Sequence, residues 1–99
     1  MALNDIEKAC MEICDDSINM YVPWYIMAAY AYYVEDEPIL EDKTFDLLSR
    51  RIVDKWNEID HRHKTYLDLD MLKAGTYIGD YPPQIKGALR EIRDVYRQR

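Results

Sequence analysis

Aromatic and carboxylate side chains that could hold a small planar ligand fall close together in the run YYVEDEPILEDKTFDLL. Tyr32 and Tyr33 end one predicted helix. Asp42, Phe45 and Asp46 begin the next. Aromatic faces stack on a flat ring or attract its positive charge, and carboxylates accept hydrogen bonds from its N–H groups. An ordinary helix hairpin, in which Asp42 is only a cap and the tyrosines only pack, would use the same residue types.

A helix hairpin over about residues 22–58 would bring these side chains to one end of the molecule. Its first helix begins near Pro23, which suits a first helical turn, and it ends before Pro38, which forces the preceding residue out of helical geometry. Asp42 is expected to be the N-cap of the second helix. The apolar residues of that helix recur every three or four positions as far as Ile59.

The other predicted helices precede and follow the hairpin. The segment LNDIEKACMEICDDSI has apolar residues at helical spacing and either Asn4 or Asp5 as its cap. A short helix near residues 69–73 ends at Gly75, and a final helix opens at Pro83. We therefore expect all 99 residues to form one all-α domain, a small bundle of four to five helices.

Charge and hydropathy argue against several classes of protein. The net charge of −6 and the pI of about 4.8 disfavour direct nucleic-acid binding, because the phosphate backbone attracts cationic surfaces. No apolar run approaches the roughly 18–20 residues of a membrane span, and MALNDIEKAC lacks the pattern of a signal peptide. We expect a cytoplasmic protein that does not bind membranes.

The cysteines and histidines do not predict a metal site. Cys10 and Cys14 share one face of a predicted helix but are poorly placed for a disulfide, so they are expected to be buried, reduced thiols. His61 and His63 lie in a predicted loop and are expected to be exposed. The spacing CMEIC…HRH matches no standard zinc pattern, so no metal is expected, although a metal or proton-transfer role for the histidines is an alternative.

The final helix carries a local excess of positive charge. From residue 82 onward the sequence contains five basic residues and two acidic ones. The basic residues of the helix itself are Lys86, Arg90, Arg93 and Arg97. They form either a solvated face, whose cations suit a helix C-terminus, or a docking surface for an acidic protein partner. Several surplus aromatic residues, such as Trp24 and Tyr77, are also compatible with a homo-oligomer.

Catalytic motifs are absent from the sequence. KAGTYIG has neither the spacing nor the preceding strand of a phosphate-binding loop, and neither Ser17 nor Ser49 has the context of a nucleophile. We therefore expect no catalytic residue.

Within the opening run, the residues that fit a longer motif are Tyr32, Tyr33, Val34, Asp36, Pro38, Asp42, Phe45, Asp46 and Leu48. They match, without a gap, the pattern Tyr-(His/Tyr)-Val-x-Asp-x-Pro-x-x-x-Asp-x-x-Tyr-Asp-x-Leu. The run therefore resembles the small helical N-terminal domain of NAD-dependent DNA ligases, of the type that binds nicotinamide mononucleotide. The match covers roughly a fifth of the chain.

The resemblance implies a ligand and a role for each matched residue. In that family the domain grips the nicotinamide mononucleotide (NMN) half of NAD while the enzyme is adenylated. Tyr32 and Tyr33 would then contact the nicotinamide or the ribose. Asp42 and Asp46 would accept hydrogen bonds from amide or ribose groups. Phe45 replaces the usual tyrosine, so it can stack but lacks a hydroxyl hydrogen bond worth about 0.5–1.5 kcal/mol.

The resemblance does not extend to catalysis. No lysine of the chain stands in the Lys-x-Asp-Gly motif that ligation requires. The segment LDLDMLKAGTYIGDYPPQIKGALREI instead resembles short, stand-alone, ligase-related proteins of bacteriophages. The expected function is a non-catalytic module that binds NMN or NAD, alone or with a partner. The alternative is an acidic interaction or inhibitor protein, such as a phage accessory or counter-defence protein, that keeps the hairpin only as a scaffold.

Overall fold

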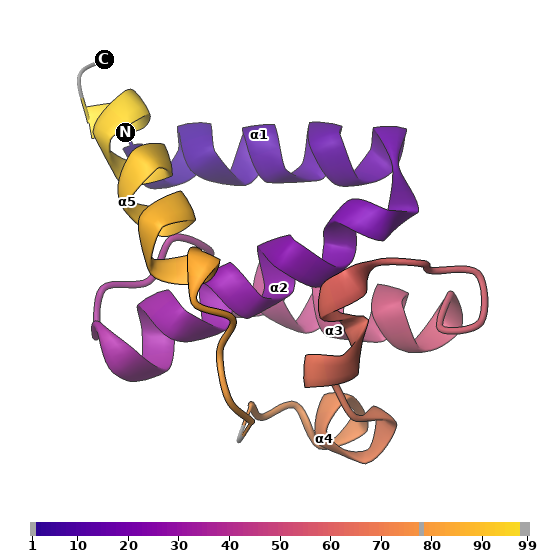
Figure 1. Cartoon of the computed structure of the whole chain (residues 1–99). Helices are drawn as coiled ribbons and strands as arrows, with labels where there is room; N and C mark the ends of the chain where they lie inside the picture. Colours follow the sequence, from indigo (N-terminus) through magenta and orange to yellow (C-terminus); the bar gives the residue numbers. More distant parts are fainter. Residues whose placement is uncertain (1, 78, 98–99) are drawn as a thin grey trace.

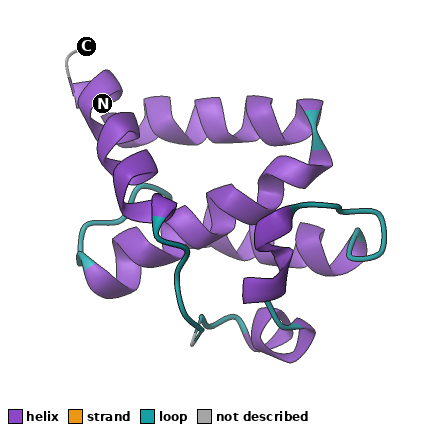
Figure 2. Ribbon diagram, in the orientation of Figure 1, coloured by secondary structure: helices purple, strands orange, loops and turns teal. Residues whose placement is uncertain are grey.

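The computed structural model describes residues 2–77 and 79–97, and this part of the chain contains helices and loops without a strand (Figure 2). The α-helices are α1 (Ala2–Asp16), α2 (Tyr21–Ala29), α3 (Asp42–Asp54), α4 (Leu69–Ala74) and α5 (Gln84–Arg97). The predicted all-α fold, with a hairpin in the middle of the chain and a final helix after Pro83, is confirmed.

Helix α2 lies at the centre of the bundle (Figure 1). It contacts α3 and α5, and it is preceded by a 3₁₀ turn at Ile18–Met20 that also packs on it. Eight of its nine residues are buried, so this helix is apolar on all sides, as expected for one that neighbours enclose. Helix α1 packs on α5, and α4 packs on α3. Helix α3 therefore connects the central helix to α4, and α5 connects it to α1.

A π-helical turn, Tyr30–Val34, prolongs α2 to the end that the sequence predicts. The Glu35 N–H donates to the Tyr30 carbonyl oxygen at 3.1 Å, across five residues instead of four. Asp36 then takes a left-handed conformation with φ 52°, which aspartate tolerates better than most residues. The wider turn changes the direction in which the following side chains point.

The boundaries of α3 differ from the predicted ones. The Glu41 carbonyl oxygen accepts the first helical hydrogen bond, from the Phe45 N–H at 3.0 Å, so Glu41 is the N-cap and the assignment of that role to Asp42 is wrong. Asp42 is the first helical residue, where its negative charge suits the positive end of the helix. The helix ends at Asp54, and hydrogen-bonded turns continue the apolar pattern to the buried Ile59.

The outer helices confirm most of the expected features. Helix α1 already includes Asn4 and Asp5, so neither is its N-cap. Cys10 and Cys14 are buried, free thiols, as predicted. Helix α4 ends at the predicted Gly75, which has φ 74°, the left-handed conformation that favours glycine.

The linker of residues 35–41, between α2 and α3, is held by two helices that are distant in the sequence. The Arg93 guanidinium of α5 lies 3.1 Å from a carboxylate oxygen of Glu35 and 3.1 Å from one of Glu37. Its side chain is only 12% exposed. At the other end of the linker, a Glu7 carboxylate of α1 accepts a hydrogen bond from the Glu41 N–H. The linker is therefore positioned by tertiary contacts.

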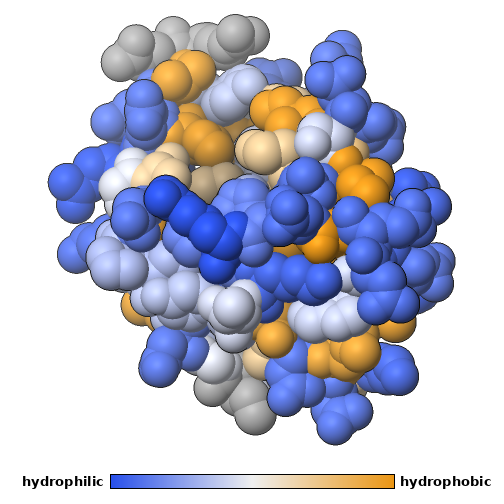
Figure 3. Space-filling view, turned by 45° about the vertical axis from the view of Figure 1, so that its right-hand side comes forward, coloured by the Kyte–Doolittle hydropathy of each residue, from blue (hydrophilic) through white to orange (hydrophobic). Residues whose placement is uncertain are grey.

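The face shown in Figure 3 is mainly hydrophilic, with smaller apolar areas between the polar side chains. None of the described helices is both long enough and apolar enough to cross a membrane.

Candidate functional site

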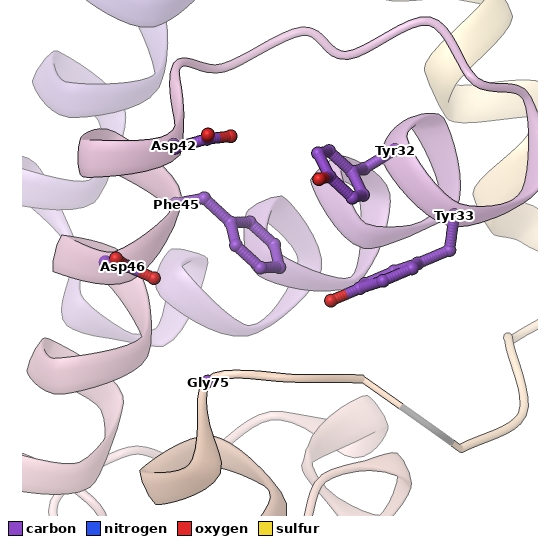
Figure 4. Close-up of a pocket in the computed structure, with 6 residues that line it drawn as sticks. All are labelled: Tyr32, Tyr33, Asp42, Phe45, Asp46 and Gly75. Atoms are coloured by element: carbon purple, nitrogen blue, oxygen red, sulfur yellow. The ribbon is translucent and has the colours of Figure 1, made fainter.

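One pocket brings together all five residues that the sequence singles out. Its lining residues are Tyr32, Tyr33, Asp42, Phe45, Asp46 and Gly75 (Figure 4). The cavity measures about 230 Å³. Pockets for drug-sized ligands measure about 300–1,000 Å³, so this one has room for a single ring with its substituents and not for a whole dinucleotide.

Three aromatic rings, two of which line the pocket, lie nearly parallel to one another. The Phe45 ring lies 4.7 Å from the Tyr25 ring and 6.5 Å from the Tyr32 ring, centroid to centroid. Its plane is within 13° of the first and 10° of the second. Tyr25 and Tyr32 are seven residues apart on one continuous helical segment, and Phe45 lies between their rings. The wider spacing is on the side of Tyr32, which is 45% exposed.

Tyr33 forms a second wall of the pocket. Its ring lies 4.9 Å from the Tyr32 ring at 71°, an edge-to-face arrangement. Its hydroxyl is 3.4 Å from the Thr76 hydroxyl, in the segment that follows α4. Figure 4 shows this hydroxyl pointing toward Gly75, on the far side of the pocket from Asp42. The end of α2 is thus connected to the end of α4 across the cavity.

The sequence reading missed Gly75 as a lining residue. Gly75 is the predicted end of α4, and a glycine in the left-handed conformation leaves backbone uncovered at that point. A Cβ built on it would have no heavy atom within 4 Å, so the backbone conformation, rather than crowding, explains the glycine. Gly75 is far from the two tyrosines in sequence, so no local pattern predicts that it lines the same pocket.

Asp42 and Asp46 supply negative charge at the mouth of the pocket. They are one turn apart on α3 and both are exposed. Within residues 2–77 and 79–97, neither carboxylate makes a hydrogen bond or an ion pair. The nearest lysine in sequence, Lys43, is 3.7 Å from Glu41 instead. Two unpaired carboxylates therefore stand next to three aromatic rings.

Tyr25 lies beneath the pocket and is fully buried. Burial raises the pKa of its hydroxyl to about 12, so the phenol stays neutral at physiological pH. The hydroxyl has no hydrogen bond of ordinary geometry, although the nearby Ser49 hydroxyl moderates the rise of its pKa. Ser49 itself donates to the Leu72 carbonyl oxygen at 2.7 Å, which ties α3 to α4. The Tyr25 ring thus packs under Phe45, on the side of α3 that is tied to α4.

The two histidines are partly buried, whereas the sequence predicts that they are exposed, and they pack against each other. Their ring centroids are 5.2 Å apart. The backbone N–H of His63 donates to the ring atom Nδ1 of His61 at 3.0 Å. Burial lowers the pKa of both imidazoles. No cluster of three or more potential metal ligands occurs among the described residues.

The basic helix is engaged within the molecule at one of its predicted partner-binding residues. Arg93 pairs with Glu35 and Glu37. Lys86 and Arg90 are exposed. The side chain of Arg97 lies outside the described part of the chain.

Comparison with known proteins adds no assignment. The chain matches no protein-family model, no curated protein and no solved structure.

Proposed function

We propose that the protein is a non-catalytic binding module whose pocket receives the nicotinamide ring of NMN or NAD. The observation that carries this proposal is the gathering of Tyr32, Tyr33 and Phe45 with two unpaired carboxylates around a cavity the size of one ring. A planar heterocycle can stack on these aromatic faces. Its carboxamide N–H groups and the ribose hydroxyls are donors, and ionised carboxylates only accept.

The size of the pocket supports a division of the ligand. A nicotinamide ring fits within about 230 Å³, whereas the ribose and phosphate would extend from its mouth. Asp42 and Asp46 line the same pocket from α3, on either side of Phe45 in sequence (Figure 4). Their carboxylates would accept hydrogen bonds from the groups next to the ring. The exposed remainder of the ligand would be free to contact a partner protein, so the module could bind alone or complete a shared site.

The resemblance to the N-terminal domain of NAD-dependent DNA ligases also supports the proposal. The five residues to which that motif would give contacts with NMN are the five that line this pocket, together with Gly75. Phe45 retains the stacking face without the hydroxyl of the usual tyrosine. Affinity would therefore depend more on stacking and on the carboxylates.

Thermal unfolding in the presence of NMN, NAD and ATP tests the proposal. A ligand at 100 times its Kd stabilises a protein by about 2.7 kcal/mol, which shifts the melting temperature measurably. We expect a shift with NMN and NAD but not with ATP, whose adenine and triphosphate lack the carboxamide and add negative charge. Asp46→Ala should abolish the shift. Asp54→Ala, on the same helix but away from the pocket, should preserve it.

A second candidate function is protein–protein interaction through the same end of the molecule. Val34 is 53% exposed beside Tyr32 and Tyr33, which are also exposed, and such apolar groupings are used at interfaces. Absence of a thermal shift with millimolar NMN and NAD would reject nucleotide binding by the isolated chain. Loss of a captured partner on Val34→Asp, but not on Val95→Asp at a similarly exposed position of α5, would support the interaction.

A further inference from the structure

We propose that a groove beside α4 is a docking surface for a basic peptide segment of a partner protein. The segment would carry an apolar side chain next to a lysine or an arginine. The groove is separate from the pocket described above and measures about 470 Å³, roughly twice the volume of that pocket. The proposal does not depend on nicotinamide binding, because it uses other residues.

The apolar walls of the groove come from two neighbouring segments. The chain just before α4 contributes Tyr66 and Leu67, and one face of α4 contributes Met71 and Ala74. Leu67 and Met71 are each 7% exposed, and Ala74 is exposed at the end of the helix. Aromatic residues and methionine are enriched at protein interfaces, and the flexible methionine side chain adapts to differently shaped partners. The groove is therefore suited to an apolar side chain.

The charges in the groove are both negative. Asp68 and Asp70 are exposed lining residues, and neither makes an ion pair within residues 2–77 and 79–97. Asp68 caps α4 by accepting from the backbone N–H of Asp70 at 2.7 Å, and an ionised carboxylate has further acceptor sites. No lysine or arginine is among the described lining residues. The groove lacks the positive charge that a basic partner would bring.

Apolar walls and unpaired carboxylates together define the chemistry of the occupant. A short chain segment presents an apolar side chain and a basic one within a few ångströms of each other, so one segment can use both features. Hydrogen bonds from an ammonium or guanidinium group to a carboxylate are about twice as strong as neutral ones. A volume of about 470 Å³ lies within the roughly 300–1,000 Å³ of ligand-binding clefts. An acidic segment would be repelled from the same surface.

The groove lies next to the ring pocket without sharing a described lining residue with it. Gly75 lines the pocket, and its neighbours Ala74 and Thr76 line the groove. The Thr76 hydroxyl is 3.4 Å from the hydroxyl of Tyr33, which also lines the pocket. A docked partner would therefore lie beside the pocket, yet the two sites can be altered separately.

Three synthetic peptides test the proposal in an NMR titration of the full chain at low salt. The first is acetyl-Gly-Lys-Leu-Phe-Lys-Gly-amide, the second has glutamate in place of both lysines, and the third has serine in place of leucine and phenylalanine. The first should cause saturable shifts of the backbone amides of Leu67, Met71 and Ala74. The other two should bind at least tenfold more weakly. Added salt should weaken binding of the first, because salt screens exposed charges.

A double variant tests the role of the carboxylates. Asp68→Asn with Asp70→Asn removes both charges, and asparagine is as good a helix cap as aspartate. Binding of the first peptide should weaken several-fold. Asp15→Asn with Asp16→Asn changes the net charge equally at exposed positions of α1, which lies on the other side of the molecule from α4 (Figure 1). This control should keep the affinity of the wild-type protein.

A single variant tests the groove itself. Ala74→Arg places a long, positively charged side chain in the groove, and a cation near the end of a helix is compatible with the fold. Binding of the first peptide should be lost, while thermal unfolding shows that the protein remains folded. Ala88→Arg, at an exposed position of α5, should bind the peptide as the wild-type protein does.

Three results would overturn the proposal. The first is equal binding of the basic and acidic peptides, or no binding of any peptide at millimolar concentration. The second is a set of shifts that map away from the groove, for example around Asp42 and Asp46, and that persist in Ala74→Arg. The third is a dimer of the chain alone in sedimentation experiments that Ala74→Arg abolishes and Ala88→Arg does not, because the groove would then bind a second copy instead of a different partner.

Discussion

The two ends of the α2–α3 hairpin differ in whether their polar side chains have hydrogen-bond or ion-pair partners within the protein. At the end where α3 stops, the Lys64 ammonium group donates to the carbonyl oxygens of Trp56 and Ile59 and lies 4.5 Å from the centre of the Trp56 ring. Asn19 Oδ1 accepts from the Asp60 N–H at 2.8 Å, which closes the loop onto the start of α2. We call this the closed end.

The other end carries the pocket, and we call it the open end; although its linker is held by ion pairs, two of its carboxylates have no partner within the described residues. Asp42 and Asp46 make neither a hydrogen bond nor an ion pair within the described residues, and Tyr32 and Tyr33 are nearly half exposed. Groups that are satisfied internally contribute to folding, whereas groups left unpaired near a cavity contribute little to it and remain available to a ligand. The contrast predicts that substitutions at the two ends have different effects.

The largest loss of stability is expected at the closed end. Lys64→Met leaves two partly buried carbonyl oxygens without their donor, which should lower the free energy of unfolding by about 1–3 kcal/mol. Urea denaturation measures this change. Lys55→Met is the matched control, because its ammonium group is 4.0 Å from Glu58 and both side chains are largely exposed. Similar effects of the two substitutions would contradict the assignment of Lys64 to the closure of this end.

A smaller loss is expected from the contact that holds the linker. Arg93→Met removes the pairing with Glu35 and Glu37 and a hydrogen bond to the Glu37 carbonyl oxygen, so unfolding should become easier by about 1–2 kcal/mol. Hydrogen exchange of the Glu35 and Glu37 amides should accelerate in the same variant. Arg90→Met, at an exposed position of the same helix, should change neither quantity. Unchanged exchange in Arg93→Met would show that the linker holds its conformation without α5.

Acidification should weaken the closed end to a modest extent. Burial lowers the pKa of His61 and of His63, and the charge of Arg62 acts in the same direction on both. The proximity of His63 lowers the pKa of His61 further, while Asp60 partly opposes these effects at His61. The unfolded chain therefore binds more protons than the folded one, so stability is fully present above the ordinary pKa of 6.5 and falls as the pH drops through the lowered values.

Urea denaturation at several pH values between about 7.5 and 5 checks this dependence, since the unperturbed histidine pKa lies near 6.5. His61→Gln with His63→Gln should flatten the profile over that range. A profile that keeps its slope in the double variant would assign the effect to other groups.

The smallest effect on stability is expected at the open end. Asp42→Asn with Asp46→Asn should change the free energy of unfolding by less than about 0.5 kcal/mol, as is usual for exposed positions without partners. The loss of a favourable charge at the start of α3 is offset by relief of repulsion between carboxylates one turn apart. A loss of 1 kcal/mol or more, about a typical mutational effect, would show that these carboxylates serve the fold.

Sequence patterns predict the residues of the open end more accurately than they predict the tertiary contacts around it. Local rules suffice for the break at Pro38 and the end of α4 at Gly75, because each depends on the backbone preference of one residue. The convergence of Tyr32 and Tyr33 with Phe45 follows once a hairpin is assumed. The choice of caps failed locally: Glu41 occupies the position expected for Asp42, and α1 begins before Asn4 and Asp5.

The remaining features depend on distance in space and have no local signal. The ion pairs of Arg93 span 58 and 56 residues, and the approach of Tyr33 to Thr76 spans 43. A basic residue on an amphipathic helix has the same sequence pattern whether it faces solvent or an internal acidic linker. Partial burial of His61 and His63 likewise results from the folding of their loop back on itself, which periodicity cannot predict.

The π-helical turn at Tyr30–Val34 makes the open end sensitive to the deletion of a single residue. Such a turn holds one residue more than an α-helical turn, so a deletion within it can be absorbed by reverting to ordinary helix. The chain before and after would keep its fold, but the two tyrosines would rotate relative to Phe45. Removal of Ala31 would thus disturb the site through the backbone while every side chain that lines the pocket is retained.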